Sequence, residues 1–83
     1  MSVSNSALLT FVAARYDEVD RPVTAADAAG RFDVGRESLR RQLDTLAGCE
    51  LVARQEGGYR PTVTGREFLD LDVAGDLAVV DPE

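Results

Sequence analysis

The segment Thr24–Leu43, TAADAAGRFDVGRESLRRQL, decides the fold, because a single turn separates two helical patterns within it. Thr24 is a favourable residue just before a helix, since its hydroxyl accepts a hydrogen bond from an early backbone amide. Asp27, three residues later, completes an imperfect capping box, which predicts a short helix over residues 25–32. Asp33-Val34-Gly35 interrupts the pattern with two poor helix formers, so a turn is predicted there.

A longer helix with one apolar face is predicted from about Arg36 to Gly48. The leucines at positions 39, 43 and 46 repeat at helical spacing and are expected in the core. The side chains expected to point most directly away from the leucines are Glu37, Arg41 and Asp44, with Ser38 and Arg40 on the flanks. This polar face is the first candidate for a binding surface.

The residues that precede this segment predict another amphipathic helix, over residues 5–19. Its apolar stripe consists of Leu8, Phe11, Val12 and Val19, with Tyr16 at the border. Pro22 disfavours helical backbone at the residue before it, so this helix is expected to end near Asp20. Val23 then becomes a candidate for a very short strand.

A β-hairpin and a short final helix are predicted after the long helix. Residues 51–55 and 59–63 are rich in strand formers, and paired glycines favour a tight turn across residues 56–58. Thr64 and Glu67 form a capping box, which predicts that the final helix begins there. Its apolar side consists of Phe68, Leu69 and Leu71.

These elements predict one mainly α-helical domain with a small β-hairpin. In their order and spacing, residues 24–43, 51–60 and 62–69 resemble the helix-turn-helix, the wing and the strand-to-helix exit of winged helix-turn-helix regulators, especially archaeal ones. The resemblance covers roughly residues 5–71. It implies a three-helix bundle with a wing and a short C-terminal helix, in a domain over residues 1–71.

An acidic tail or short helix is expected over residues 72–83. Val73, Leu77 and Val80 repeat at helical spacing, whereas the run from Leu77 to Val80 also suits a strand. A helix here would pack against the first helix or form a dimer contact. The sequence leaves these alternatives open.

Two positions depart from the pattern of these regulators. Asp33 stands where many of them have Gly in the turn, and Gly35 stands where Ser or Thr usually caps the following helix. Asp visits left-handed backbone more readily than most residues, and Gly is an acceptable cap, so both suit the fold. Gly35 does remove a hydroxyl that would lie near DNA phosphates.

The resemblance implies a small transcription regulator that binds double-stranded DNA sequence-specifically. In that family the helix at about 36–48 enters the major groove, and the wing at 54–60 lies along the backbone. The contact residues so implied are Arg36, Glu37, Ser38, Arg40 and Arg41 on the helix, and Arg54, Tyr59 and Arg60 on the wing. Arginine pairs with guanine or phosphate, and Glu37 accepts from cytosine or repels wrong sequences. No cofactor is implied, and a homodimer is compatible with this function.

The same residues also have plainer interpretations. Arg and Glu side chains three or four positions apart on a helix form weak ion pairs in solvent, and the Tyr59 ring would cover one face of a two-stranded ribbon. The alternative function is a winged helix that binds a protein partner instead of DNA. Clustered Arg side chains favour DNA, whereas their neutralisation by Glu37, Asp44 or Glu56 favours a protein partner.

The charge balance bears on both functions. All nine basic residues are Arg, against 15 acids, for a net charge of −6, a composition that resembles cytosolic proteins of halophilic archaea. Residues 31–66 carry seven Arg and five acids, whereas residues 67–83 carry six acids and no Arg. About five phosphate contacts give a slope of roughly −4.5 in log affinity against log salt. At high salt such contacts alone would therefore give too little affinity for DNA. Base contacts or a dimer would have to add affinity.

Composition also argues against an enzyme, a membrane protein and a secreted protein. The chain has no His and no Lys, so it lacks an imidazole base and a phosphate-binding or Schiff-base lysine. No apolar run approaches about 20 residues, and the N-terminus lacks the pattern of a signal peptide. Cys49, the only cysteine, is expected to be buried rather than exposed as a redox sensor. A cytoplasmic protein is expected.

Overall fold

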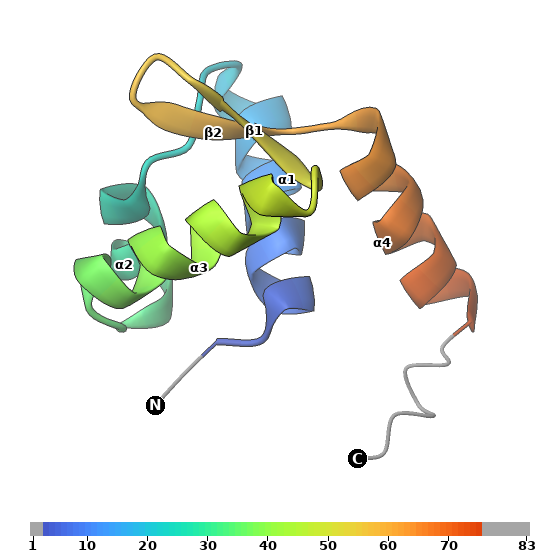
Figure 1. Cartoon of the computed structure of the whole chain (residues 1–83), viewed down its shortest axis with the longest axis horizontal. Helices are drawn as coiled ribbons and strands as arrows, with labels where there is room; N and C mark the ends of the chain where they lie inside the picture. Colours follow the sequence, from blue (N-terminus) through green and yellow to red (C-terminus); the bar gives the residue numbers. More distant parts are fainter. Residues whose placement is uncertain (1–2, 76–83) are drawn as a thin grey trace.

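The computed structural model describes the backbone of residues 3–75 and the side chains of residues 3–71. Within this part, four helices and one β-hairpin follow in the order α1, α2, α3, β1, β2, α4 (Figure 1). The helices span Asn5–Val19, Ala25–Phe32, Arg36–Gly48 and Val63–Gly75, and the strands span Val52–Gln55 and Gly58–Pro61. The prediction of a mainly α-helical fold with a small β-hairpin is therefore confirmed.

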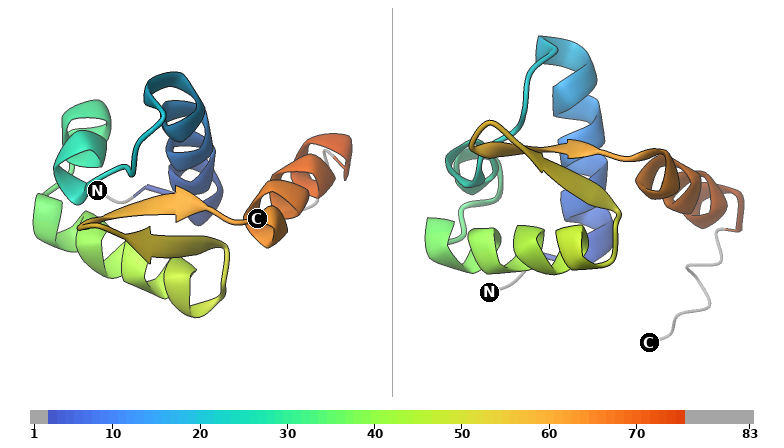
Figure 2. Two further views of the ribbon diagram at one scale, coloured as in Figure 1. Left: turned by 90° about the horizontal axis from the view of Figure 1, so that it is seen from above. Right: turned by 45° about the horizontal axis from the view of Figure 1, so that its top comes forward.

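The core lies between α1, α2 and α3, and the hairpin closes it on one side (Figures 1 and 2). The three leucines of α3 are at most 2% exposed, as their spacing predicts. In α1, Leu8 and Val12 are buried as expected, but Phe11, Tyr16 and Val19 are only half-buried. Leu9 and Ala13 are buried in addition, because α1 contacts α2 and α3 as well as β2 and α4.

The turn between α2 and α3 follows the local signals in the sequence. The capping box is complete: Thr24 Oγ1 accepts from the Asp27 amide at 3.1 Å, and Asp27 Oδ2 accepts from the Thr24 amide at 3.2 Å. Asp33 takes left-handed backbone (φ 56°), and its amide donates to the Ala29 carbonyl, which ends α2. Gly35 precedes α3 without a side-chain cap, and half-buried Val34 packs against the core.

The hairpin turn is tighter than predicted. Gln55 pairs with Gly58, so the turn consists of Glu56 and Gly57 alone, both at positive φ (43° and 81°) as in a type I′ turn. Gly58 belongs to β2, and a Cβ there would lie 2.8 Å from the Pro22 Cβ. The hairpin thus packs closely on the α1–α2 connection.

Val23 extends the hairpin by one short bridge, as its sequence position predicts. Its amide and carbonyl each bond to Tyr59 at 2.8 Å in an antiparallel bridge. The outer edge of β2 is therefore paired at Tyr59, and the ribbon is fixed to the connection that leads into α2.

The prediction that Thr64 and Glu67 cap the final helix is wrong. Helix α4 begins at Val63, and Thr62 caps it by accepting from the Gly65 amide at 2.9 Å. The Thr62 amide also bonds to the Leu51 carbonyl at 3.2 Å, so Thr62 is fixed where β2 ends. Helix α4 runs beyond residue 71 to Gly75, and the rest of the predicted tail, residues 76–83, lies outside the described residues.

Cys49 is exposed, so the prediction of burial is wrong. It is the first residue after α3, and its amide bonds to the last carbonyls of the helix. Glu50 then adopts left-handed backbone (φ 63°), which turns the chain so that Leu51 packs against the core in place of Cys49.

Candidate nucleic-acid interface

A hollow of about 540 Å³ lies between the N-terminus of α2, the flank of α3 and the turn of the hairpin. Its charged lining consists of three arginines and two acids: Arg36, Arg40 and Arg54, with Asp44 and Glu56. Residues 24–26 of α2 and residues 55–59 of the hairpin complete it. The hollow is thus lined by residues from both segments that the sequence predicts to contact DNA, the helix α3 and the hairpin.

Arg36 and Arg40 lie one turn apart on α3, which places both on the flank that faces the hairpin. Both side chains are exposed. Among the side chains of residues 3–71, no carboxylate lies within 4.0 Å of either guanidinium. Their charges are therefore available to an external anion.

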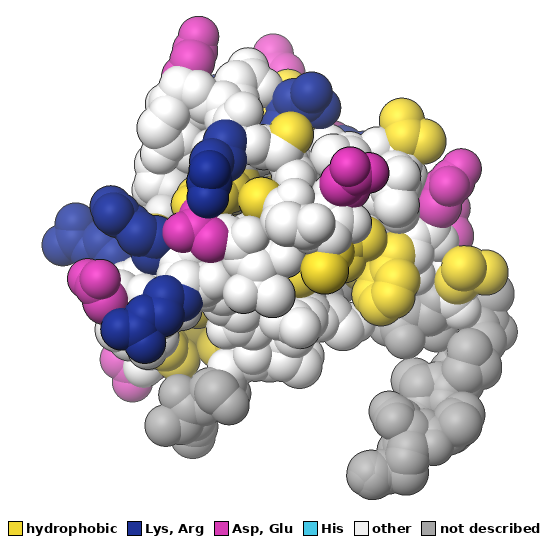
Figure 3. Space-filling model, viewed as in Figure 1, with side chains coloured by type: hydrophobic (Ala, Val, Ile, Leu, Met, Phe, Trp, Pro, Cys, Tyr) yellow, Lys and Arg dark blue, Asp and Glu magenta, His cyan; other side chains and the backbone are white. Residues whose placement is uncertain are grey.

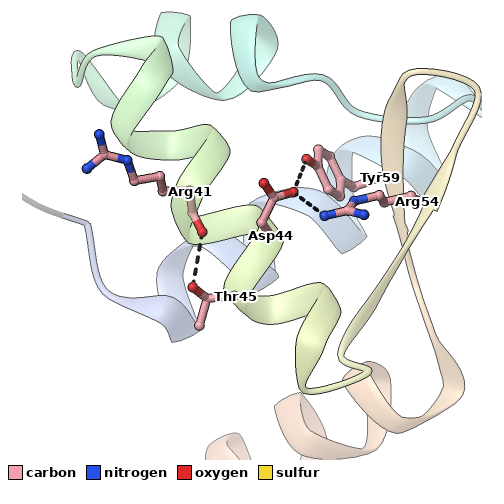
Figure 4. Close-up of polar contacts among 5 residues, drawn as sticks. All are labelled: Arg41, Asp44, Thr45, Arg54 and Tyr59. Atoms are coloured by element: carbon pink, nitrogen blue, oxygen red, sulfur yellow. Dashed lines mark hydrogen bonds and ion pairs between the residues drawn. The ribbon is translucent and has the colours of Figure 1, made fainter.

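The adjacent pair Arg40 and Arg41 is divided between two faces of α3. Successive helical residues are 100° apart, and Arg41 does not line the hollow. Figure 4 shows Arg41 directed away from the hairpin, whereas Asp44 is directed toward it. Glu37 and Ser38 are also exposed near the start of α3 and lie outside the hollow. Arg41 and Glu37 therefore form the outermost part of this helix, opposite the buried leucines.

Asp44 connects α3 to both strands of the hairpin (Figure 4). Its Oδ1 atom accepts a hydrogen bond from the Tyr59 hydroxyl at 2.7 Å and from Arg54 Nη2 at 2.9 Å. The Tyr59 hydrogen bond, followed by that from Arg54, lowers the pKa of Asp44 below its usual 3.8. The pKa of Arg54 is raised in turn, chiefly by its hydrogen bond to Asp44. Asp44 is therefore ionised at neutral pH.

Tyr59 is positioned as a packing residue. The residue is 8% exposed, and burial raises the pKa of its hydroxyl, with the Asp44 hydrogen bond adding to the effect. Tyr59 pairs directly with Arg54 across the hairpin, so both side chains lie on the face toward α3. The ring covers one face of the two-stranded ribbon, which is the packing role expected from the sequence as the alternative to DNA contact.

Arg60 lies apart from the other candidates of the hairpin. Neighbouring residues of a strand point to opposite faces, so Arg60 projects away from the face of Tyr59. It is exposed, does not line the hollow, and its Nη1 atom lies 3.5 Å from the Pro61 carbonyl. The hairpin therefore presents Arg54 and Arg60 on different sides.

The sequence did not reveal the cluster of Asp44, Arg54 and Tyr59. It identified Asp44 as a possible neutraliser of arginine, and Arg54 and Tyr59 as candidates on the wing. The pairing of Arg54 with Tyr59 follows from a two-residue turn between Gln55 and Gly58. Their approach to Asp44 depends on how the hairpin docks on α3, for which the sequence carries no local signal.

Arginine and apolar side chains gather on different sides of one face of the molecule, with acids on both sides (Figure 3). Arginine side chains, with acids between them, gather over the side where α2, α3 and the hairpin meet, and apolar side chains gather toward α4. Three large apolar residues of α4 are exposed: Val63 at 74%, Phe68 at 42% and Leu71 at 68%. Two surfaces of different chemistry therefore lie on one small domain.

None of the helices in the described part of the chain is long and apolar enough to span a lipid bilayer. Within the same part, no three His, Cys, Asp or Glu side chains are grouped as metal ligands. No protein-family model, curated protein or solved structure matches this chain.

Proposed function

We propose that the chain is a winged helix-turn-helix domain of a transcription regulator and binds double-stranded DNA through α3 and the hairpin. The observation that carries the proposal is the placement of Arg36 and Arg40 beside the hairpin, both exposed and with no carboxylate within 4.0 Å among residues 3–71. An acidic protein that keeps such arginines together on one helix flank has a local site for a polyanion.

In this proposal α3 lies in the major groove. Arg41 and Glu37, on the outermost face, reach base edges, since Arg pairs bidentately with guanine and Glu accepts from cytosine. Arg36 and Arg40 bind phosphates of the strand beside the hairpin, and Ser38 and Arg60 bind the flanking backbone. Tyr59 supports the hairpin from within, because its hydroxyl is engaged by Asp44.

The salt dependence of binding tests these roles. Fluorescence anisotropy with a pool of labelled 20-base-pair duplexes is measured between 50 and 500 mM KCl for the wild type, Arg36→Gln and Arg15→Gln. Each lost phosphate contact reduces the slope of log affinity against log salt by about 0.9. We expect that reduction for Arg36→Gln and none for Arg15→Gln, whose arginine lies on α1 near Glu18. Equal slopes in all three proteins would contradict the phosphate role.

A homodimer forms part of the proposal, because two half-sites add the affinity that phosphate contacts lose at high salt. The exposed apolar side chains of α4, Phe68 and Leu71, support it. Sedimentation equilibrium in 50 mM and 2 M KCl measures the assembly state. A chain that is monomeric at both salts, with and without duplex, would contradict this part.

The second candidate function is a protein-interaction module. The neutralisation of Arg54 by Asp44 favours it, since one of three arginines in the hollow is already paired within the chain. The same anisotropy experiment separates the two functions. If the folded protein binds no duplex even at 50 mM KCl, DNA binding is contradicted, and binding to a protein partner is the function to test next.

A further inference from the structure

Asp44 carries a negative charge inside the hollow that the proposed function assigns to phosphates. It lies one turn after Arg40, and Arg40 as well as Arg54 contributes to the lowered pKa of its carboxyl group. With Glu56 it sets two negative charges against the three arginines of the lining. A carboxylate at this position repels the phosphates that the arginines attract.

The Asp44 carboxylate also forms an ion pair with Arg54. Nη2 of Arg54 lies 2.9 Å from Asp44 Oδ1, although 66% of the Arg54 side chain is exposed. The guanidinium is thus at the surface, where a phosphate would meet it, but its positive charge is already paired with a carboxylate of the same chain. A phosphate must compete with Asp44 before Arg54 adds a contact.

The negative charge of Asp44 is not needed to join α3 to the hairpin. An Asn side chain has the same shape, and its Oδ1 atom accepts hydrogen bonds from a tyrosine hydroxyl and a guanidinium. The connection between Asp44, Arg54 and Tyr59 therefore separates into geometry, which Asn retains, and charge, which only Asp supplies.

We propose that Asp44 is a specificity-determining residue of the DNA site, whose charge neutralises that of Arg54 and so weakens binding to duplexes of any sequence. This inference rests on the proposed DNA-binding function. Affinity from phosphates is independent of sequence, so reducing it increases the share of the binding energy that comes from base contacts. Removing the charge of Asp44 is expected to leave the charge of Arg54 unpaired, so that Arg54 adds one phosphate contact.

The test uses the full chain, a mixed-sequence duplex pool and the salt series described above. We expect Asp44→Asn to steepen the salt slope by about 0.9, which corresponds to roughly eightfold tighter binding near 0.1 M KCl. Glu56→Gln is the matched control, because it removes the same charge from the same hollow at a residue without an ion pair among residues 3–71. We expect its slope to stay at the wild-type value.

Two further variants keep the inference testable if Asp44→Asn fails to fold. Arg54→Gln should retain the wild-type slope, because the paired arginine makes no phosphate contact, and Asp44→Asn/Arg54→Gln should return the slope to that value. An unchanged slope in folded Asp44→Asn, an equal change in Glu56→Gln, or a slope reduced by about 0.9 in Arg54→Gln would each overturn the inference while DNA binding stands. Absence of binding by every protein at 50 mM KCl would instead overturn the proposed function, and this inference with it.

Discussion

The Tyr59 hydroxyl donates a hydrogen bond to the Asp44 carboxylate across 2.7 Å, and so joins β2 to α3. Tyr59 also bonds through its backbone to Val23, before α2. One residue therefore connects three segments that are distant in the sequence. It fixes the hairpin beside the flank of α3 that carries Arg36 and Arg40, and the shape of the candidate interface depends on it.

Removing the Tyr59 hydroxyl should raise the pKa of Asp44 toward 3.8, because the Tyr59 hydrogen bond is the largest cause of its lowering. A ¹³C NMR titration of the Asp44 carboxyl carbon in Tyr59→Phe measures the change. Tyr16→Phe is the control, since Tyr16 lies on α1 and has no hydrogen bond to Asp44. An unshifted pKa in Tyr59→Phe would mean that the two side chains do not interact in solution.

The same pKa predicts how stability depends on acidity. The folded-state pKa of Asp44 is lowered, so its interactions stabilise the fold above about pH 3.8. That contribution is lost as the pH falls through the lowered value in the folded protein. Denaturation midpoints measured from pH 5 to pH 2 should fall less steeply for Tyr59→Phe than for the wild type. Parallel curves for the two proteins would contradict this linkage.

Replacing Gly65, in the first turn of α4, should destabilise the fold. A Cβ there would lie against the Leu51 carbonyl oxygen, far inside van der Waals contact, so the helix or the strand must shift. We expect Gly65→Ala to lower the free energy of unfolding by about 1–3 kcal/mol. Gly30→Ala, in α2 with open space around the Cβ, should raise it by about 0.5–1 kcal/mol. Urea denaturation measures both, and equal effects would contradict the close packing of α4 on Leu51.

Thr62 and Thr64 provide a direct test of where α4 begins. Thr62 accepts from the Gly65 amide, and its hydroxyl lies 2.7 Å from the Glu50 carbonyl. Thr62→Ala should therefore cost about 1 kcal/mol, the usual value of a lost N-cap. Thr64 is exposed within the first turn, so Thr64→Ala should stay within about 0.5 kcal/mol of the wild type. If urea denaturation showed a larger loss of stability for Thr64→Ala than for Thr62→Ala, Thr64 would be the cap instead.

Local signals in the sequence predicted most of the fold. The cap at Thr24 depends on residues within one turn of it and was predicted correctly, and Asp33 adopts the left-handed backbone that was expected to suit an Asp. The start of α4 was predicted incorrectly because two threonines compete for the cap. The contact of Thr62 with Leu51, eleven residues away, decides between them. Cys49 was misplaced for a similar reason, since the left-handed Glu50 turns the chain before Leu51.

The sequence predicted which residues belong to the candidate site, but it did not predict how they are arranged around the hollow. Helical spacing alone places Arg36 and Arg40 on one flank and Arg41 on another. The ion pair between Asp44 and Arg54 depends on the docking of the hairpin, which is set by the Val23 bridge and the contact of Gly58 with Pro22. No local pattern encodes that docking.

The most direct test of DNA binding is an NMR titration of the ¹⁵N-labelled chain with the duplex pool in 50 and 500 mM KCl. We expect amide and guanidinium shifts at Arg36, Arg40 and Arg41 and at the hairpin turn, with Arg15 on α1 unaffected. Shifts at Arg41 that persist in 500 mM KCl would support contacts with bases. A folded spectrum without shifts at either salt would contradict DNA binding by α3 and the hairpin.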